Sequence, residues 1–293
     1  MRDVLRCFDR LLLQDEPSRA RFEVLGAVAT DISVVGALKA AARPLPADTG
    51  EVAQLKAAIG ARPVWFAAAT HPVEETGVIS AHARVREYFE DAMLIVAPRY
   101  MESAEGLERA AQDRFETVHR RGRGEALGPT TDVYIADTLG DMGRWYRLSP
   151  MSFVGHSISA AGGEGGGGKN PYEAIALGSV VIHGPDVQDF SETYDDLNSA
   201  GATRQVASMD ELSTAVVALM RGHGADECRA AAQKVIAARR GVLDTTWAEI
   251  GRAIAREFAV SIQIVTGPSF TSETAMSAPN CPVSTAISQS RKA

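Results

Sequence analysis

A glycine-rich segment in the middle of the chain has the composition of a ligand-binding loop. It covers residues 162–168, and Lys169, Asn170 and Pro171 follow it directly. Glycine lets a backbone approach a ligand closely. Asn170 suits the N-cap of a helix and Pro171 suits its first turn. Because free N–H groups at the start of a helix favour an anion, we expect the backbone of residues 168–170 to contact a phosphate.

Several alternatives to this interpretation stay open. Glu173 could accept hydrogen bonds from ribose hydroxyls, or it could complete a capping box with Asn170. The glycine run could also be a flexible loop without a ligand. Residues 163–169 match the first seven positions of a P-loop, but Asn170 stands where Ser or Thr would hold magnesium.

The elements around this loop predict a doubly wound parallel sheet over about residues 50–240. Short apolar segments predict buried strands at Val64–Ala68, Met93–Ala97, Val133–Ala136, Ser152–Gly155, Val180–His183 and Thr203–Val206. Amphipathic segments predict helices at Glu74–Phe89, Glu105–Gln112, Asp141–Leu148, Pro171–Leu177, Phe190–Ala200 and Glu211–Met220.

The two ends of the chain have different patterns. The elements expected there are a helix at Phe8–Gly26, a strand at Ile32–Val35, a linker at Ala42–Gly50, and helices at Asp226–Arg239 and Val242–Phe258. The last residues are rich in Ser, Thr and Pro, which predicts a disordered tail. The domains expected are therefore residues 1–40, residues 41–258 and a tail, 259–293.

Polar residues follow the predicted strands at the edge where open α/β sheets bind ligands. Thr70 and His71 follow the first strand and could donate to a phosphate or a sugar, although a lone histidine is often structural. Arg99 follows the second strand and could bind a phosphate or a carboxylate with two nitrogens, or form only a surface ion pair. We expect Trp65, Trp145 and Tyr146 to pack in the core, the alternative being that they stack on a base.

Composition excludes several classes of protein. The net charge of −7 argues against a nucleic-acid binder. The scattered cysteines Cys7, Cys228 and Cys281 predict neither a zinc site nor a disulfide framework, and favour a reducing compartment. No apolar run approaches a membrane span, and the first residues do not resemble a signal peptide. We expect the basic residues 119–123 to form a solvated turn, or a face toward anionic lipid.

Several motifs in this order are similar to those of the 3-deoxy-D-manno-octulosonate (Kdo) transferases of lipopolysaccharide synthesis. The matching segments are Ala69-Thr70-His71, Pro98-Arg99-Tyr100, Asp137-Thr138-Leu139-Gly140-Asp141, Phe153-Val154-Gly155-His156-Ser157, Gly167-Gly168-Lys169-Asn170-Pro171-Tyr172-Glu173, Ala176-Leu177-Gly178 and Gly184-Pro185. The resemblance covers roughly residues 10–220. The sequence departs from the family pattern where Tyr100 and Lys169 replace histidines and His156 replaces a glycine, and in its longer glycine loop.

The resemblance implies a GT-B glycosyltransferase, in which two Rossmann-like domains face each other. This chain would hold the C-terminal, donor-binding domain and only the end of the N-terminal domain. The family transfers Kdo from CMP-Kdo to a lipid A precursor at the cytoplasmic face of the inner membrane. Its catalytic carboxylate belongs to the N-terminal domain, so we expect this chain to be soluble, to bind the donor and to transfer nothing by itself.

The departing CMP builds negative charge on a phosphate oxygen, which the protein must stabilise with donors placed in advance. No Asp-x-Asp metal motif stands at a strand end, so we expect no metal and no cofactor. Gly140 is expected near the cytosine. The residues expected to bind the donor are Thr70, His71, Arg99, Gly140, Gly168, Lys169, Asn170 and Glu173. The other functions considered are a non-catalytic nucleotide-binding module and a different GT-B enzyme, such as a UDP-sugar transferase.

Overall fold

The computed structural model describes residues 2–36, 38, 44–159, 165–238 and 241–265. The chain forms two compact units, one that extends to Thr246 and a second that begins at Trp247. Among the described residues, no helix combines the length and the apolar character needed to cross a lipid bilayer.

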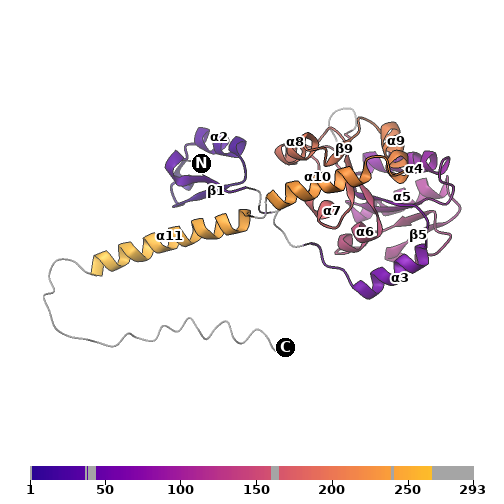
Figure 1. Ribbon diagram of the computed structural model, residues 1–293, viewed down its shortest axis with the longest axis horizontal. Helices are drawn as coiled ribbons and strands as arrows, with labels where there is room; N and C mark the ends of the chain where they lie inside the picture. Colours follow the sequence, from indigo (N-terminus) through magenta and orange to yellow (C-terminus); the bar gives the residue numbers. More distant parts are fainter. Residues whose placement is uncertain (1, 37, 39–43, 160–164, 239–240, 266–293) are drawn as a thin grey trace. The chain divides into compact units, whose positions relative to one another are not determined.

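A parallel sheet of seven strands forms the centre of the first unit (Figure 1). Its strand order is β5-β6-β4-β3-β7-β8-β9. The strands are β3 (Val64–Thr70), β4 (Met93–Pro98), β5 (Val118–Arg120), β6 (Val133–Ile135), β7 (Met151–Val154), β8 (Val180–His183) and β9 (Thr203–Gln205). In the register, Phe66 of β3 lies between Ile95 of β4 and Ser152 of β7. All six predicted strands are confirmed, and β5 is an additional strand.

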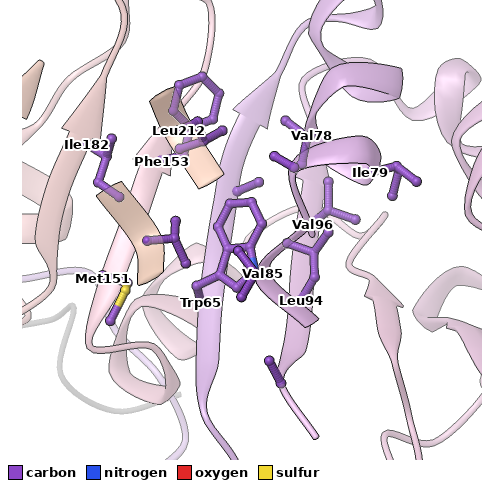
Figure 2. Packing of buried hydrophobic residues seen from close by; sticks show 14 of the residues in the cluster. Trp65, Val78, Ile79, Val85, Leu94, Val96, Met151, Phe153, Ile182 and Leu212 are labelled. Atoms are coloured by element: carbon purple, nitrogen blue, oxygen red, sulfur yellow. The ribbon is translucent and has the colours of Figure 1, made fainter. Parts of the chain in front are cut away.

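Helices cover both faces of this sheet and enclose two hydrophobic cores. One core includes side chains of α4 (Pro72–Arg86), α5 (Ala104–Gln112) and α9 (Met209–Met220). Figure 2 shows Trp65, Val96 and Phe153 of the sheet in this core, with Val78 of α4 and Leu212 of α9. The other core includes side chains of α3 (Thr49–Ile59), α6 (Met142–Leu148), α7 (Tyr172–Ala176), α8 (Ser191–Ser199) and α10 (Ala225–Ala238). Trp65 and Trp145 are fully buried, as predicted.

The chain changes direction across the sheet between its two central strands. β3 leads into α4 on one face, whereas the segment after β7 leads into α7 on the opposite face. Such a switch leaves a crevice at the carboxyl ends of the two strands, because their following segments diverge. The loops that follow β3 and β7 therefore meet where a ligand is expected to bind.

The N-terminal region differs from the predicted helix at Phe8–Gly26. The structure has α1 (Arg2–Leu5), then β1 (Leu11–Leu13), which pairs in parallel with β2 (Ile32–Val34). After β1, Asp15 starts a helix: its carboxylate accepts the Ser18 N–H at 2.6 Å and caps α2 (Glu16–Val24). The predicted helix is confirmed over Glu16–Val24 and wrong for residues 8–15, where a strand pairs with β2 and Asp15 caps the helix.

The linker predicted at Ala42–Gly50 ends earlier than expected. α3 already begins at Thr49, because the Asp48 carboxylate accepts the Glu51 N–H at 2.7 Å and caps the helix. At the other end of the chain, α11 (Val242–Val265) continues beyond Phe258. The prediction that disorder begins at residue 259 is therefore wrong for residues 259–265, while residues 266–293 lie outside the described residues.

The basic segment 119–123 is a solvated turn only in part, because residues 121–123 form a short 3-10 helix with Gly122 and Arg123 exposed. Part of it forms β5, and its arginines pair with carboxylates of neighbouring elements. Arg120 contacts Asp137 at 2.5 Å. Arg121 contacts Asp141 at 2.8 Å and Glu51 at 3.1 Å, and Arg123 contacts Glu108 at 2.5 Å. Because these cations are already paired, the segment does not present the free positive charge that an anionic lipid surface needs.

Candidate donor-binding site

A cavity of about 330 Å³ opens at the carboxyl ends of the central strands. Its lining comes from the carboxyl ends of β3, β4 and β7, from the segments after β4 and β6, from α6, and from residues at the start of α7 and just before it. Five of the eight predicted donor-binding residues line it: Arg99, Gly140, Lys169, Asn170 and Glu173. These residues are far apart in the sequence, and the parallel sheet brings them to one edge.

The remaining walls of this cavity are mostly apolar. Met101, Leu139, Met142, Tyr146 and Phe190 contribute to them. Tyr146 packs in the core as predicted and also reaches the cavity, where burial raises the pKa of its hydroxyl. Sequence reasoning missed the other four, because an apolar side chain that faces a ligand has the same signature as one that faces the core. For Met101 and Leu139, a position shortly after a predicted strand was the available signal.

Two cations lie at this cavity. Arg99 is exposed and, within the described part of the chain, forms no ion pair with a carboxylate. The Lys169 amine donates to the Gly168 carbonyl at 3.0 Å. Burial lowers the pKa of Lys169, and the nearby Arg99 charge lowers it further. An anion bound in the cavity would reduce the repulsion between these two positive charges, so the cavity favours an anion.

The segment before α7 is arranged differently from the predicted helix start. The Asn170 Oδ1 accepts the Tyr172 N–H at 3.1 Å, and its Nδ2 lies 3.4 Å from Glu173 Oε1. The Gly168 N–H already donates to the His156 carbonyl at 2.6 Å. α7 extends only over Tyr172–Ala176, so few peptide dipoles add up at its start. A phosphate at this point would rely on Lys169 and Asn170 rather than on Gly168.

Thr70 and His71 do not line the cavity. Thr70 is fully buried, and its Oγ1 has no hydrogen-bond partner among the residues that the structure describes. His71 caps α4, where its Nδ1 accepts the Val73 N–H at 3.4 Å. The geometry thus gives His71 the structural role that sequence reasoning had left open as an alternative.

Glu74 holds together the two loops that meet at the crevice. Its Oε2 accepts the N–H groups of His71 and His156 at 2.8 Å, and its Oε1 accepts those of Ser157 and Ile158 at 3.0 Å. Burial of the side chain raises the pKa of this carboxyl, and the four N–H groups oppose the shift. The sequence places Glu74 at the start of a predicted helix but gives it no role.

Gly155 explains how closely these loops pack. A Cβ at this position would lie 2.8 Å from the Ala69 carbonyl oxygen and 2.9 Å from Glu74 Oε2. Among the described non-glycine residues, Ala69 and His156 have φ in the left-handed region, at 52° and 57°. Such strain is concentrated at functional sites in proteins, and here it occurs on both sides of the crevice.

The rings of His71, Tyr100 and His156 form a cluster at the same edge. The His71 and His156 ring centroids are 4.8 Å apart, and Tyr100 lies 5.7 Å from His71 and 6.1 Å from His156. Burial lowers the pKa of His156 to about 4, with a further contribution from the positive charge of Lys169. This imidazole is therefore neutral at pH 7.

Comparison with known proteins agrees with this architecture. A 3-deoxy-D-manno-octulosonic acid transferase of Rickettsia felis is 25% identical over 227 residues, which are 78% of this chain and 47% of the relative. The Bordetella pertussis transferase of the same name is 31% identical over 209 residues, 69% of this chain and 46% of the relative. The chain spans about half the length of the curated relatives it matches. No protein-family model matches it.

A solved structure covers the sheet domain. The C-terminal CMP-Kdo binding domain of WaaA from Acinetobacter baumannii is 28% identical, with a TM-score of 0.59 over 64% of this chain and 96% of that domain. The fold is therefore that of the parallel-sheet domain of the GT-B glycosyltransferases. Within that class, the chain is a relative of the 3-deoxy-D-manno-octulosonic acid transferases and is similar to their C-terminal portion.

Proposed function

We propose that this chain binds CMP-Kdo and forms the donor-binding half of a Kdo transferase. The observation that carries the proposal is the cavity that contains Arg99, Lys169 and Glu173 at the carboxyl ends of the central strands. The two cations fit the phosphate of a nucleoside monophosphate or the carboxylate of Kdo. The Glu173 carboxylate fits the ribose hydroxyls, and the apolar walls fit a flat base.

The chemistry assigned to these residues is stabilisation of the leaving group. As the bond between Kdo and the phosphate breaks, negative charge grows on the CMP oxygen. Arg99 and Lys169 can hold that charge without reorganising, because both already lie at the cavity. We assign no general base to this chain and propose that the transfer needs neither a metal nor a cofactor. The acceptor we propose is a lipid A precursor at the cytoplasmic face of the inner membrane.

The test is titration calorimetry of the purified chain with CMP, UDP and ATP, each without magnesium. We expect CMP to bind most tightly, because the cavity offers one pair of cations for one phosphate. Tighter binding of UDP would favour a UDP-sugar transferase of the same fold. ATP binding that requires magnesium would favour a P-loop instead. Binding of CMP without any transfer after an acceptor domain is supplied would favour a non-catalytic module.

A further inference from the structure

The Ser103 side chain joins the segment after β4 to the buried carboxyl of Glu75 on α4. This segment begins at Arg99 and continues into the short 3-10 helix η3 (Met101–Ser103). The Ser103 Oγ lies 2.6 Å from Glu75 Oε1 and 2.9 Å from the Tyr100 carbonyl oxygen. Both contacts are made by the hydroxyl group, so replacement of the side chain removes both.

The two contacts of this hydroxyl need two hydrogens. A serine hydroxyl carries a single hydrogen, so it can donate to only one of the two oxygens. If Glu75 is protonated, its carboxyl donates to Ser103 Oγ, and the hydroxyl donates onward to the Tyr100 carbonyl. If Glu75 is ionised, the hydroxyl must donate to the carboxylate, and the Tyr100 carbonyl keeps the Ser103 N–H at 3.1 Å. The protonated form alone makes hydrogen bonds of both contacts.

The surroundings of Glu75 make both forms accessible near neutral pH. The residue is 5% exposed, and burial raises the pKa of its carboxyl to about 7. The Ser103 hydroxyl opposes this rise in pKa, and the negative charge of Glu74 adds to it. Glu75 also lines a cavity of about 390 Å³, which gives its carboxyl a route to exchange a proton. The other charged residues that line this cavity are Glu102, Glu105 and Arg109.

Tyr100 connects this chain of hydrogen bonds to the donor-binding cavity. The Arg99 N–H donates to the Thr70 carbonyl at 2.9 Å, so the backbone is fixed there and Tyr100 is the first residue beyond it. The Arg99 Cζ lies 5.9 Å from the centroid of the Tyr100 ring, within reach of a cation–π contact. Met101, the next residue, lines the donor-binding cavity together with Arg99. A change at the Tyr100 carbonyl therefore acts on two residues of that cavity.

We propose that Glu75 is a positioning residue for donor binding, whose protonated form holds Tyr100, and through it Arg99, at the cavity. The proposal rests on the proposed function, in which Arg99 binds the phosphate or the carboxylate of the donor. Glu75 acts through Ser103 and Tyr100 and does not contact the ligand itself. Because donor binding and protonation favour the same form, this residue weakens donor binding as pH rises through 7.

Calorimetric titration with CMP at pH 6 and pH 8.5 tests the proposal. The phosphate of CMP also titrates, near about pH 6, so each variant is compared with the wild type at the same pH. Glu75→Gln keeps an NH₂ donor for Ser103 in place of the protonated carboxyl. We expect it to match the wild type at pH 6 and to bind CMP about threefold more tightly at pH 8.5, a difference within the range of one hydrogen bond. Glu102→Gln removes a charge from the same cavity and is the matched control, which should match the wild type at both pH values.

Ser103→Ala removes the middle of the hydrogen-bond chain. We expect this variant to bind CMP about threefold more weakly than the wild type at pH 6 and equally at pH 8.5, where the wild-type carboxyl is ionised. In a Ser103→Ala background, Glu75→Gln should have no further effect on CMP affinity, because the group through which Glu75 acts is gone.

A ratio of the Glu75→Gln and wild-type affinities that is the same at both pH values would overturn the inference. An equal pH effect in Glu102→Gln would overturn it too, because it would show that any negative charge at this cavity weakens binding. If Glu75→Gln does not fold, as judged by thermal melting, the loss in Ser103→Ala at pH 6 alone carries the test.

Failure of the proposed function is distinguishable from failure of this inference. If the wild-type chain binds no CMP, the proposed function fails, and the amide NMR signal of Ser103 still tests the proton-linked contact. In the wild type this signal should shift with a midpoint near pH 7, and Glu75→Gln should remove that transition. A wild-type signal without the transition would overturn the contact itself.

Discussion

The Glu74 carboxylate accepts the backbone N–H of His156 at 2.8 Å, although the two residues lie on different strand connections. The bond joins the start of α4 to the loop after β7 across the switch point of the sheet. Three further N–H groups point to the same carboxylate. One buried side chain thus provides the acceptors for four backbone N–H groups of the two loops.

Replacement of Glu74 by glutamine should destabilise the chain strongly. The amide presents an NH₂ group to N–H donors that need an acceptor, so buried donors lose their partners. We expect a loss of about 3 kcal/mol in the free energy of unfolding. Urea denaturation at pH 7.5 measures it. Glu75→Gln on the same helix is the matched control, and equal losses in the two variants would contradict the prediction.

Glu75 should make stability depend on pH. Burial raises the pKa of this carboxyl to about 7, although the Ser103 hydroxyl donates to it at 2.6 Å. Because the folded pKa lies above the unfolded value, the folded state binds more protons between about pH 4.5 and 7. Stability from this group is therefore present at low pH and is lost as pH rises through 7.

Glu75→Gln removes this titration. Its free energy of unfolding relative to the wild type should rise by roughly 2 kcal/mol between pH 4.5 and 7.5. Urea denaturation of both proteins at these two pH values measures the difference in stability between variant and wild type. The titration of all other groups contributes equally to both proteins and cancels in this difference. A difference that does not change with pH would show that Glu75 titrates normally.

Glu173→Gln separates a ribose contact from a capping role. Glutamine keeps an oxygen for a helix start but loses the charge. If Glu173 accepts ribose hydroxyls, the variant should keep its melting temperature and lose about tenfold in CMP affinity, because hydrogen bonds to charged groups contribute roughly 1.5–3 kcal/mol. Calorimetry and thermal melting measure the two quantities. Unchanged affinity, with destabilisation of Glu173→Ala, would assign the residue to the helix start.

Ala69→Gly should stabilise the chain. Ala69 has a φ of 52°, where glycine has no steric penalty. Relief of the strain at this positive φ should exceed the cost that arises because glycine makes the unfolded chain more flexible. We therefore expect an increase of about 0.5 kcal/mol in the free energy of unfolding. Urea denaturation measures it. Ala68→Gly is the control. Ala68 lies in the paired part of β3, so this variant should be less stable than the wild type. A loss of stability in Ala69→Gly would show that its backbone is not strained.

The sequence by itself determined the sheet and most of one cavity wall. The strands of a covered parallel sheet are continuous apolar segments, so Val64–Ala68 and Val180–His183 were readable without the fold. Arg99 was identified because polar residues after such strands must lie at one edge, and Lys169 because it follows the glycine segment before a predicted helix. These are local sequence patterns, and the parallel topology alone places the residues that follow the strands at one edge of the sheet.

Only the tertiary structure decided which polar groups remain for a ligand. The Gly168 N–H is taken by the His156 carbonyl, a partner twelve residues earlier in the chain that no local spacing encodes. The four donors to Glu74 come from two loops that are adjacent only after the sheet forms. A hydrogen-bonding group contacts whichever partner lies nearest in space, and that distance depends on how the whole chain packs.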